Sequence, residues 1–306
     1  MASIEFDHVM GFNALPAIFH PNGKNYLYCS GGNIVIGDLL DAHSQIFLRQ
    51  HDDIITYLTI SVSGKYIASG QGGEHPDIFV WDFETRQILY RFEEHDSKIE
   101  ALSFSLDERI LASIGNNDDG KLMIWDLSNG CIIASASRIP ADTLFVSCDG
   151  GYMKDIKKRD TDHYMIFTGG KDGLVMWDLD PYSGDMVNSK ITGDVRATIN
   201  REITNVSFSD SKEFLFGSTT SGDYIIASLR SHKITHSINA TKMSVNCILS
   251  YNDGVVIGCG DFTIKIFGSA GDFRGQLQLD GPVIGLSFSP DKLEVRLYVL
   301  NFFGAN

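Results

Sequence analysis

The chain has 306 residues, 43% of them apolar, and its 39 acidic and 25 basic residues give a net charge of −14. A chain of this length and apolar content can bury a large core in one domain. The acidic balance argues against duplex nucleic acid or an anionic membrane as the main partner, because both require a positive surface.

Targeting and cysteine signals are sparse. No stretch reaches the roughly 18 unbroken apolar residues of a spanning helix, and the opening MASIEFDHVM lacks the basic start and apolar centre of a signal peptide. We therefore expect a soluble, cytoplasmic protein without membrane insertion. The five cysteines are widely spaced and include no Cys-x-x-Cys pair. This spacing predicts buried core thiols rather than a zinc site or a disulfide framework.

Two short motifs recur along the chain. The first is an alternating apolar strand that ends in Trp-Asp, found as FVWDF (79–83), MIWDL (123–127) and VMWDL (175–179). The second is an apolar stretch with serine or threonine at alternate positions, found as LTIS (58–61), LSFS (102–105), VSFS (206–209) and LSFS (286–289). Recurrence at a fixed period indicates a repeat protein.

The second motif gives the number of units. Weaker copies at IFHP (18–21), LFVS (144–147) and ILSY (248–251) complete seven units about 40 residues apart. The long fourth interval predicts an insertion at 150–163 and a long exit at 180–201. Each unit contains four short alternating strands, which is typical of a propeller blade. We predict an all-β, seven-bladed propeller that forms one domain over residues 1–306.

The seventh unit is incomplete in the sequence, since the chain stops at FFGAN (302–306), where a third strand would begin. We expect the N-terminal stretch IEFDHV (4–9) to join this blade beside VIGLSFS (283–289). A blade shared between both chain ends would close the ring and remove free sheet edges.

Four polar side chains of the third unit stand at the places of a buried tetrad: His95, Ser113, Asp119 and Trp125. In this arrangement the unit resembles the WD-repeat family. A tryptophan N–H between blades needs an acceptor, and a buried aspartate needs donors; serine and histidine satisfy both in series. We interpret the set as structural rather than catalytic, because a nucleophile must reach a substrate.

Other units retain only part of this set. Unit two keeps His51, Ser69 and Trp81, but GGEHPD (72–77) replaces its Asp-Gly turn. Unit four keeps Asp172 and Trp177 and lacks the histidine. Units five to seven have no tryptophan, so we expect them to be held by apolar packing.

The chain offers no pattern for catalysis. It has no dinucleotide or phosphate-binding glycine loop and no Gly-x-Ser-x-Gly elbow. The acidic and histidine-bearing stretches 51–53 and 160–163 have no further ligand that would complete a metal site. We therefore predict neither enzyme activity nor a cofactor or metal.

Two loops are possible partner contacts. One is the unit-two loop, with Glu74 and His75. The other is the insertion of unit four, whose four basic residues are Lys154, Lys157, Lys158 and Arg159. The basic cluster fits either a solvated loop or a contact with an acidic partner surface.

Longer runs are more specific than the blade motifs. Residues 9–36, 64–71 and 95–127, with VMGFN, IASGQ and KIEALSFS as their distinctive parts, resemble the N-terminal propeller of the cilia- and flagella-associated protein 52 family. The resemblance implies a ciliary WD-repeat microtubule inner protein with two tandem propellers, of which this chain holds the first. It further implies tubulin and other axonemal inner proteins as partners, and we expect the chain to be monomeric in isolation.

Two other functions share the same fold. A general cytosolic WD-repeat adaptor would show every blade signal. A substrate receptor of a ubiquitin ligase often carries Trp-Asp-x-Arg, whereas the three Trp-Asp pairs here continue as Phe83-Glu84, Leu127-Ser128 and Leu179-Asp180. This difference makes the receptor the weaker alternative.

Overall fold

The computed structural model describes residues 13, 15–41, 43–155, 157, 159–193, 202–252, 254–288 and 295–299. Every regular element in these ranges is a β-strand. Unit one comprises β1 (Ile18–Phe19), β2 (Asn25–Ser30), β3 (Asn33–Asp38) and β4 (Gln45–Arg49). Unit two comprises β5 (Ile55–Ile60), β6 (Tyr66–Gln71), β7 (Ile78–Asp82) and β8 (Ile88–Phe92). Unit three comprises β9 (Ile99–Phe104), β10 (Ile110–Gly115), β11 (Lys121–Asp126) and β12 (Ile132–Ser137).

The later units follow the same plan with additions. Unit four comprises β13 (Thr143–Ser147), β14 (Tyr152–Lys154), β15 (Asp160–Gly170), β16 (Gly173–Leu179) and β17 (Met186–Gly193). Unit five comprises β18 (Ile203–Phe208), β19 (Phe214–Thr219), β20 (Asp223–Ser228) and β21 (Lys233–Asn239). Unit six comprises β22 (Val245–Tyr251), β23 (Gly254–Cys259), β24 (Thr263–Phe267) and β25 (Phe273–Gln278). Unit seven comprises β26 (Val283–Phe288) and β27 (Val295–Val299).

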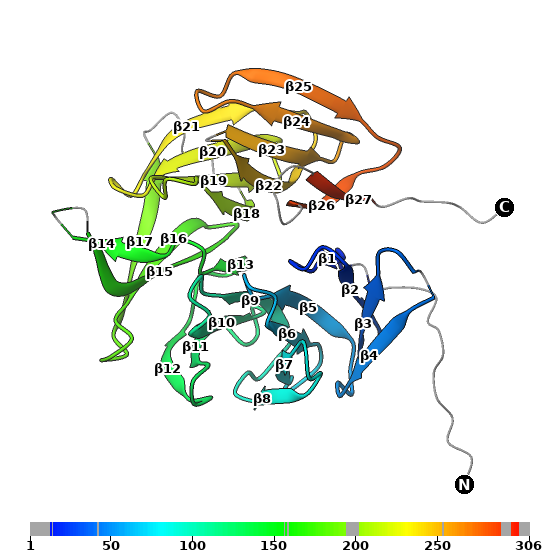
Figure 1. Cartoon of the computed structure of the whole chain (residues 1–306). Helices are drawn as coiled ribbons and strands as arrows, with labels where there is room; N and C mark the ends of the chain where they lie inside the picture. The colour runs from blue at the N-terminus through cyan, green and yellow to red at the C-terminus, as the bar shows by residue number, and fades with distance from the viewer. Residues whose placement is uncertain are drawn as a thin grey trace, which may run out of the picture.

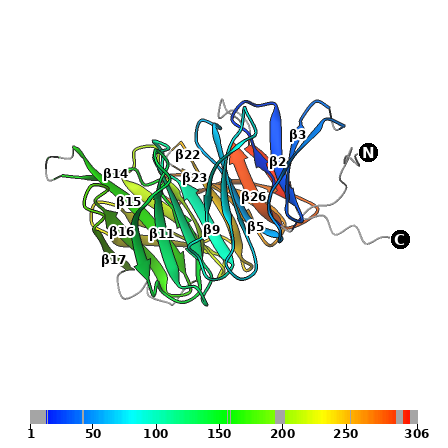
Figure 2. The same cartoon turned by 90° about the horizontal axis from the view of Figure 1, so that it is seen from below.

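Within each unit the strands form an antiparallel meander in chain order, except that in unit four β13 and β14 both pair with β15. The units follow one another around a ring, with the first strand of each near the centre (Figure 1). Seen at right angles to this view, their sheets stand side by side (Figure 2). The prediction of an all-β propeller is confirmed. The completion of a seventh blade by residues 4–9 stays a prediction, because those residues lie outside the described ranges.

The core consists of apolar layers between neighbouring sheets. One layer joins Ala68 and Val80 of unit two to Leu102 and Leu111 of unit three, and all four are buried. Trp125 closes this layer by stacking on Phe92 of unit two, with ring centroids 4.1 Å apart. Each sheet therefore packs against a neighbouring sheet on both sides, so apolar residues occupy both of its faces.

The recurrent serines of the second motif have a structural purpose. Ser61, Ser105 and Ser209 each accept, through Oγ, the N–H of the residue five positions later, at 3.0–3.1 Å. These bonds fix the turn between the first two strands of a unit. The preceding Ser103 instead accepts the backbone N–H of Cys148 in unit four at 3.0 Å. Ser207 does the same toward Ser250 of unit six at 2.9 Å.

A second series of side-chain bonds links neighbouring units at or near their first strands. Asn13, Thr56, Thr204 and Asn246 each donate to a backbone carbonyl of the next unit. Asn246 Nδ2 donates to the Val283 carbonyl at 2.8 Å and so attaches unit seven to unit six. The inner wall of the ring is thus held by specific hydrogen bonds as well as by apolar packing.

Units four and five are joined in a way that the sequence did not predict. Thr192 and Gly193 of β17 pair in parallel with Lys233 and Ile234 of β21. The two outer strands therefore merge their units into one nine-stranded sheet, which also includes β14.

Candidate functional site

The tetrad residues of unit three form one hydrogen-bond series. The indole N–H of Trp125 on β11 donates to Ser113 Oγ on β10 at 2.9 Å. Ser113 Oγ lies 2.7 Å from His95 Nε2, and His95 Nδ1 lies 2.8 Å from Asp119 Oδ2. Since the carboxylate can only accept, Nδ1 carries the proton, and Nε2 of a neutral ring accepts from the serine hydroxyl.

The Asp119 carboxylate ends this series at the turn between β10 and β11. It also accepts the backbone N–H groups of Asp96 at 2.6 Å and Lys121 at 3.1 Å. Burial raises the pKa of Asp119, but the hydrogen bond from His95 and these backbone bonds outweigh burial and hold the pKa below its ordinary value of 3.8. The space for the carboxylate exists because residue 115 is glycine: a Cβ there would collide with Asp119.

Unit two builds the same series with a different last member. Trp81 Nε1 donates to Ser69 Oγ at 3.1 Å, and Ser69 Oγ lies 2.7 Å from His51 Nε2. His51 Nδ1 then bonds Gln71 Oε1 at 2.7 Å. Gln71 occupies in unit two the sheet position that Gly115 occupies in unit three. Gln71 pairs with Ile55, and Gly115 pairs with Ile99, the residue equivalent to Ile55. Its side chain therefore reaches from the strand into the space that Asp119 fills from the turn.

In unit four the series is shorter. Trp177 Nε1 donates to Thr168 Oγ1 at 2.9 Å, so threonine replaces the serine. Asp172 does not join this pair, contrary to its place in the predicted partial tetrad. It lies exposed in the hairpin turn between β15 and β16. Because no histidine is present to receive its carboxylate, nothing compensates for burying that charge.

Burial limits the chemistry of the tetrad. The side chains of His95 and Asp119 are 1% and 0% exposed, and Ser113 is 0% exposed. A serine nucleophile acts only where substrate can approach its hydroxyl. The arrangement therefore links strands and turn inside the sheet stack and offers no surface for a reaction.

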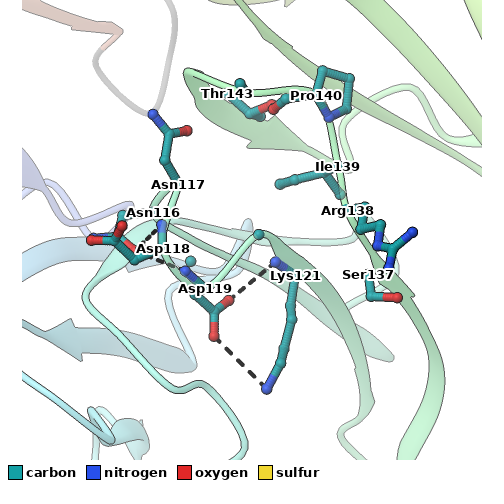
Figure 3. A pocket seen from close by; sticks show the side chains of 13 residues that line it. Asn116, Asn117, Asp118, Asp119, Lys121, Ser137, Arg138, Ile139, Pro140 and Thr143 are labelled. Atoms are coloured by element: carbon teal, nitrogen blue, oxygen red, sulfur yellow. Dashed lines mark hydrogen bonds and ion pairs between the residues drawn. The ribbon is translucent and has the colours of Figure 1, made fainter.

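A polar pocket of about 300 Å³ lies beside the Asp119 turn, between residues 115–121 and the connection 137–143 that leads to unit four. Figure 3 shows Asp119 and Lys121 on one side and Ile139, Pro140 and Thr143 across from them. Asn117 links the two sides, because its Nδ2 donates to Asp142 and its Oδ1 accepts the Asp142 N–H. Intramolecular bonds thus account for much of this polarity.

The unit-two loop rests on unit three. Glu74 forms an isolated β-bridge with Ser97, and the His75 N–H donates to the Asp96 carbonyl at 3.1 Å. Both side chains are exposed, whereas Pro76 is buried. The loop therefore has a fixed backbone and presents Glu74 and His75 to solvent.

The basic insertion forms a hairpin of β14 and the start of β15. Lys154, Lys157 and Arg159 are exposed, and Lys158 lies outside the described residues. Arg159 makes two side-chain hydrogen bonds to Asp155, at 2.8 and 2.9 Å, so one of the four charges is compensated locally. The turn 155–159 follows β14, which pairs antiparallel with β15 as the first strand β13 does, whereas the loop 72–77 follows the second strand β6. The turn and the loop therefore lie on opposite faces of the ring.

The hairpin is anchored on unit three through Asp107, a contact that the sequence did not predict. The hydroxyl groups of Tyr152 and Tyr164 both donate to Asp107 Oδ2, at 2.6 and 2.7 Å. Burial raises the pKa of Asp107, but hydrogen bonds from Ser105 and the two tyrosines hold it below its ordinary value. The aspartate is therefore a charged acceptor, and such bonds are stronger than neutral ones.

No group of three metal-ligating side chains converges anywhere in the described part of the chain. Across the same residues, no helix has the length and apolar character needed to cross a membrane. Four cysteines are buried as predicted, but Cys131 is exposed, because it lies just after the β11–β12 turn rather than on a buried strand.

Comparisons with known proteins agree with this architecture. The WD domain, G-beta repeat model matches residues 43–82 and 86–126. The solved structure of the RRP9 WD40 repeats superposes with a TM-score of 0.72 at 14% identity, covering 97% of this chain and 92% of that one. The structure of U3-55K gives the same TM-score over 95% of this chain and 90% of that one. These structures establish the shared fold.

Relatives found by sequence show a more specific resemblance than the shared fold. Cilia- and flagella-associated protein 52 of Chlamydomonas reinhardtii is 31% identical over 81% of this chain and 40% of its own length. The Homo sapiens protein of that name is 32% identical over 77% of this chain and 37% of its own length. The chain thus spans less than half of these two relatives. It is a WD-repeat β-propeller protein, and it resembles cilia- and flagella-associated protein 52.

Proposed function

We propose that the protein is a non-enzymatic interaction scaffold of the cilium or flagellum, bound to the doublet microtubules of the axoneme. The observation that carries this proposal is the resemblance to cilia- and flagella-associated protein 52 over 81% of the chain. Loops on a rigid propeller are suited to such a role, because they carry recognition while the sheets fix their positions. The buried tetrad supports the non-enzymatic part of the proposal.

The expected partners are tubulin and other axonemal inner proteins. An acidic propeller must meet acidic tubulin through local patches, since like charges repel across an interface. The two exposed loops lie on opposite faces, which would let one propeller contact two neighbours at once. Glu74 and His75 would serve one face, and Lys154, Lys157 and Arg159 the other.

Localisation tests the proposal directly. The full-length protein, tagged with a fluorescent protein, would be expressed in a flagellated cell, and its retention on salt-extracted axonemes measured. We expect salt-resistant signal along the doublets, while the free fluorescent tag is extracted completely. A diffuse signal that salt removes would refute axonemal binding and favour a general cytosolic adaptor.

A matched variant tests the basic hairpin. The variant Lys154→Ser, Lys157→Ser, Lys158→Ser, Arg159→Ser removes the positive charge of the hairpin. It keeps the two tyrosines that hydrogen-bond to Asp107. We expect weaker retention on axonemes if this face contacts an acidic partner. Unchanged retention would assign these residues to a solvated loop.

A further inference from the structure

A groove of about 400 Å³ lies between the β14–β15 hairpin and unit five. One wall is Met153–Asp155, and the other comes from the turns that follow β18 and β20. Both turns lie on the same face of the ring as the hairpin, because they follow the first strand (β18) and the third strand (β20) of unit five. The volume is within the range of about 300–1,000 Å³ that is usual for ligand sites.

The floor of the groove is apolar. Met165 and Leu229 line it and belong to the core between units four and five, with exposures of 5% and 6%. Met153 packs against the same core and is only partly buried. Methionine side chains adapt to different partner shapes, because they are unbranched and polarisable. The floor can therefore accept one aliphatic or aromatic side chain.

The rim carries positive charge in an otherwise acidic chain. Lys154 stands on the hairpin side and Arg230 on the unit-five side, and both are exposed. Among the described residues, neither forms a salt bridge. The rim also has two acidic residues. Asp155 forms a salt bridge with Arg159 at 2.8 Å, and Glu213 is the other. Charges placed on both sides of an apolar floor favour a ligand with carboxylates flanking its apolar group.

The hairpin wall is held in place before any ligand arrives. Tyr152 precedes Met153 and is hydrogen-bonded to Asp107 of unit three. On the return strand, Thr161 Oγ1 donates to the Met153 carbonyl at 2.9 Å. A preformed wall lowers the entropic cost of binding.

We propose that this groove binds an acidic peptide segment of a partner protein. One apolar side chain of the segment enters between Met153 and Leu229, and its flanking carboxylates pair with Lys154 and Arg230. The inference rests on the proposed scaffold function and specifies the chemistry of one of its partners.

Fluorescence anisotropy with designed peptides tests the groove. The probe is a fluorescein-labelled peptide with one leucine between two runs of glutamate. Companion peptides carry alanine in place of leucine, or lysine in place of glutamate. We expect the leucine–glutamate peptide to bind most tightly, with affinity falling about tenfold or more in the double variant Lys154→Glu, Arg230→Glu.

Matched variants keep the result interpretable. Lys24→Glu combined with Lys190→Glu makes the same net charge change at exposed positions elsewhere and should leave binding unchanged. Met153→Glu places a carboxylate at the floor and should weaken binding while keeping the basic rim. Each variant is used only after its thermal unfolding matches that of the parent.

Two results would overturn the proposal: equal affinity for the leucine and alanine peptides, or unchanged binding by both groove variants. Retention of the tagged protein on axonemes together with either result would reject the groove and leave the scaffold function standing. Loss of axonemal retention with intact peptide binding would reject the ciliary assignment alone.

Discussion

At the residue scale, the tetrad shows how different side chains satisfy one set of buried hydrogen bonds. The tryptophan N–H needs an acceptor in each of three units, and Ser69, Ser113 or Thr168 supplies it. The far end is more variable: Asp119 closes the series in unit three, and Gln71 does so in unit two. The requirement is for acceptors in fixed places, because an unpaired buried polar group is costly.

Ser113 should be the most sensitive member of the tetrad. Ser113→Ala removes the acceptor of Trp125 and the partner of His95, and leaves two buried polar groups unpaired. We expect the free energy of unfolding in urea to fall by about 2 kcal/mol. Ser231→Ala, at an exposed position, is the control and should change it by less than about 0.5 kcal/mol. Equal effects of the two substitutions would contradict this role.

His51 should make stability depend on pH. Burial lowers its pKa below the ordinary value of 6.5, and the bond to Gln71 opposes this only in part. Near pH 6.5 the unfolded chain therefore binds more protons at this site than the folded chain, so stability rises with pH. We expect this contribution to be complete above the unfolded pKa and to decline as pH falls toward the folded pKa.

The variant His51→Asn isolates that contribution. Urea midpoints of the parent and the variant would be compared between pH 7.5 and 5. We expect their difference to shrink on acidification, because the parent loses its advantage as the imidazole of the unfolded chain becomes protonated. A difference that stays constant across this range would contradict a lowered pKa for His51.

At the element scale, the β14–β15 hairpin extends unit four and is tied to unit three. The long interval between repeats predicted the insertion at 150–163, but nothing in the sequence predicted its anchor. Tyr152 and Tyr164 meet one carboxylate because they pair across adjacent strands. Asp107 is far from them in sequence, so only the packing of neighbouring units reveals the contact.

Asp107→Ala should loosen this hairpin. Both tyrosine hydroxyls would lose a charged acceptor, and each such bond is worth roughly 1.5–3 kcal/mol. We expect trypsin to cleave after Lys157 or Arg159 several-fold faster than in the parent, because local opening precedes cleavage. Asp185→Ala, at an exposed turn, is the matched control. Cleavage at the parental rate in Asp107→Ala would show that the hairpin is held by other contacts.

At the scale of the whole molecule, the ring depends on contacts from one first strand to the next. Thr56 donates to Ile99 O at 2.7 Å, and Asn246 donates to Val283 O at 2.8 Å. Each contact joins units that are adjacent in the chain, so the ring can grow unit by unit. Joining unit seven to unit one requires a contact between the two ends of the repeat array.

Deleting residues 1–10 tests the predicted closure of that ring by residues 4–9. Loss of a closing strand exposes the apolar face of unit seven, and we expect a stability loss of several kcal/mol, at roughly 25 cal/mol per Å² of apolar surface. Thermal unfolding of the deleted and parent chains measures it. An unchanged Tm would contradict closure by this strand.

The repeat architecture and the tetrad of unit three could be predicted from local sequence patterns. Periodic apolar strands, turn serines and Trp-Asp endings are local patterns, and each unit repeats them because each solves the same packing problem. The spacing of His95, Ser113, Asp119 and Trp125 within one unit made their meeting predictable. Gln71 and Thr168 escaped prediction because each replaces a different residue type while fulfilling the same hydrogen-bond requirement.

The contacts between units could not be predicted from the sequence and are visible only in the folded chain. The parallel pairing of β17 with β21, the Asp107 anchor and the groove beside Met153 each join residues from different repeats. Such contacts depend on how twisted sheets pack against their neighbours, and no single repeat encodes that geometry. Asp172 illustrates a related limit: the sequence placed it in a partial tetrad without a histidine, and in the structure its carboxylate is exposed to solvent.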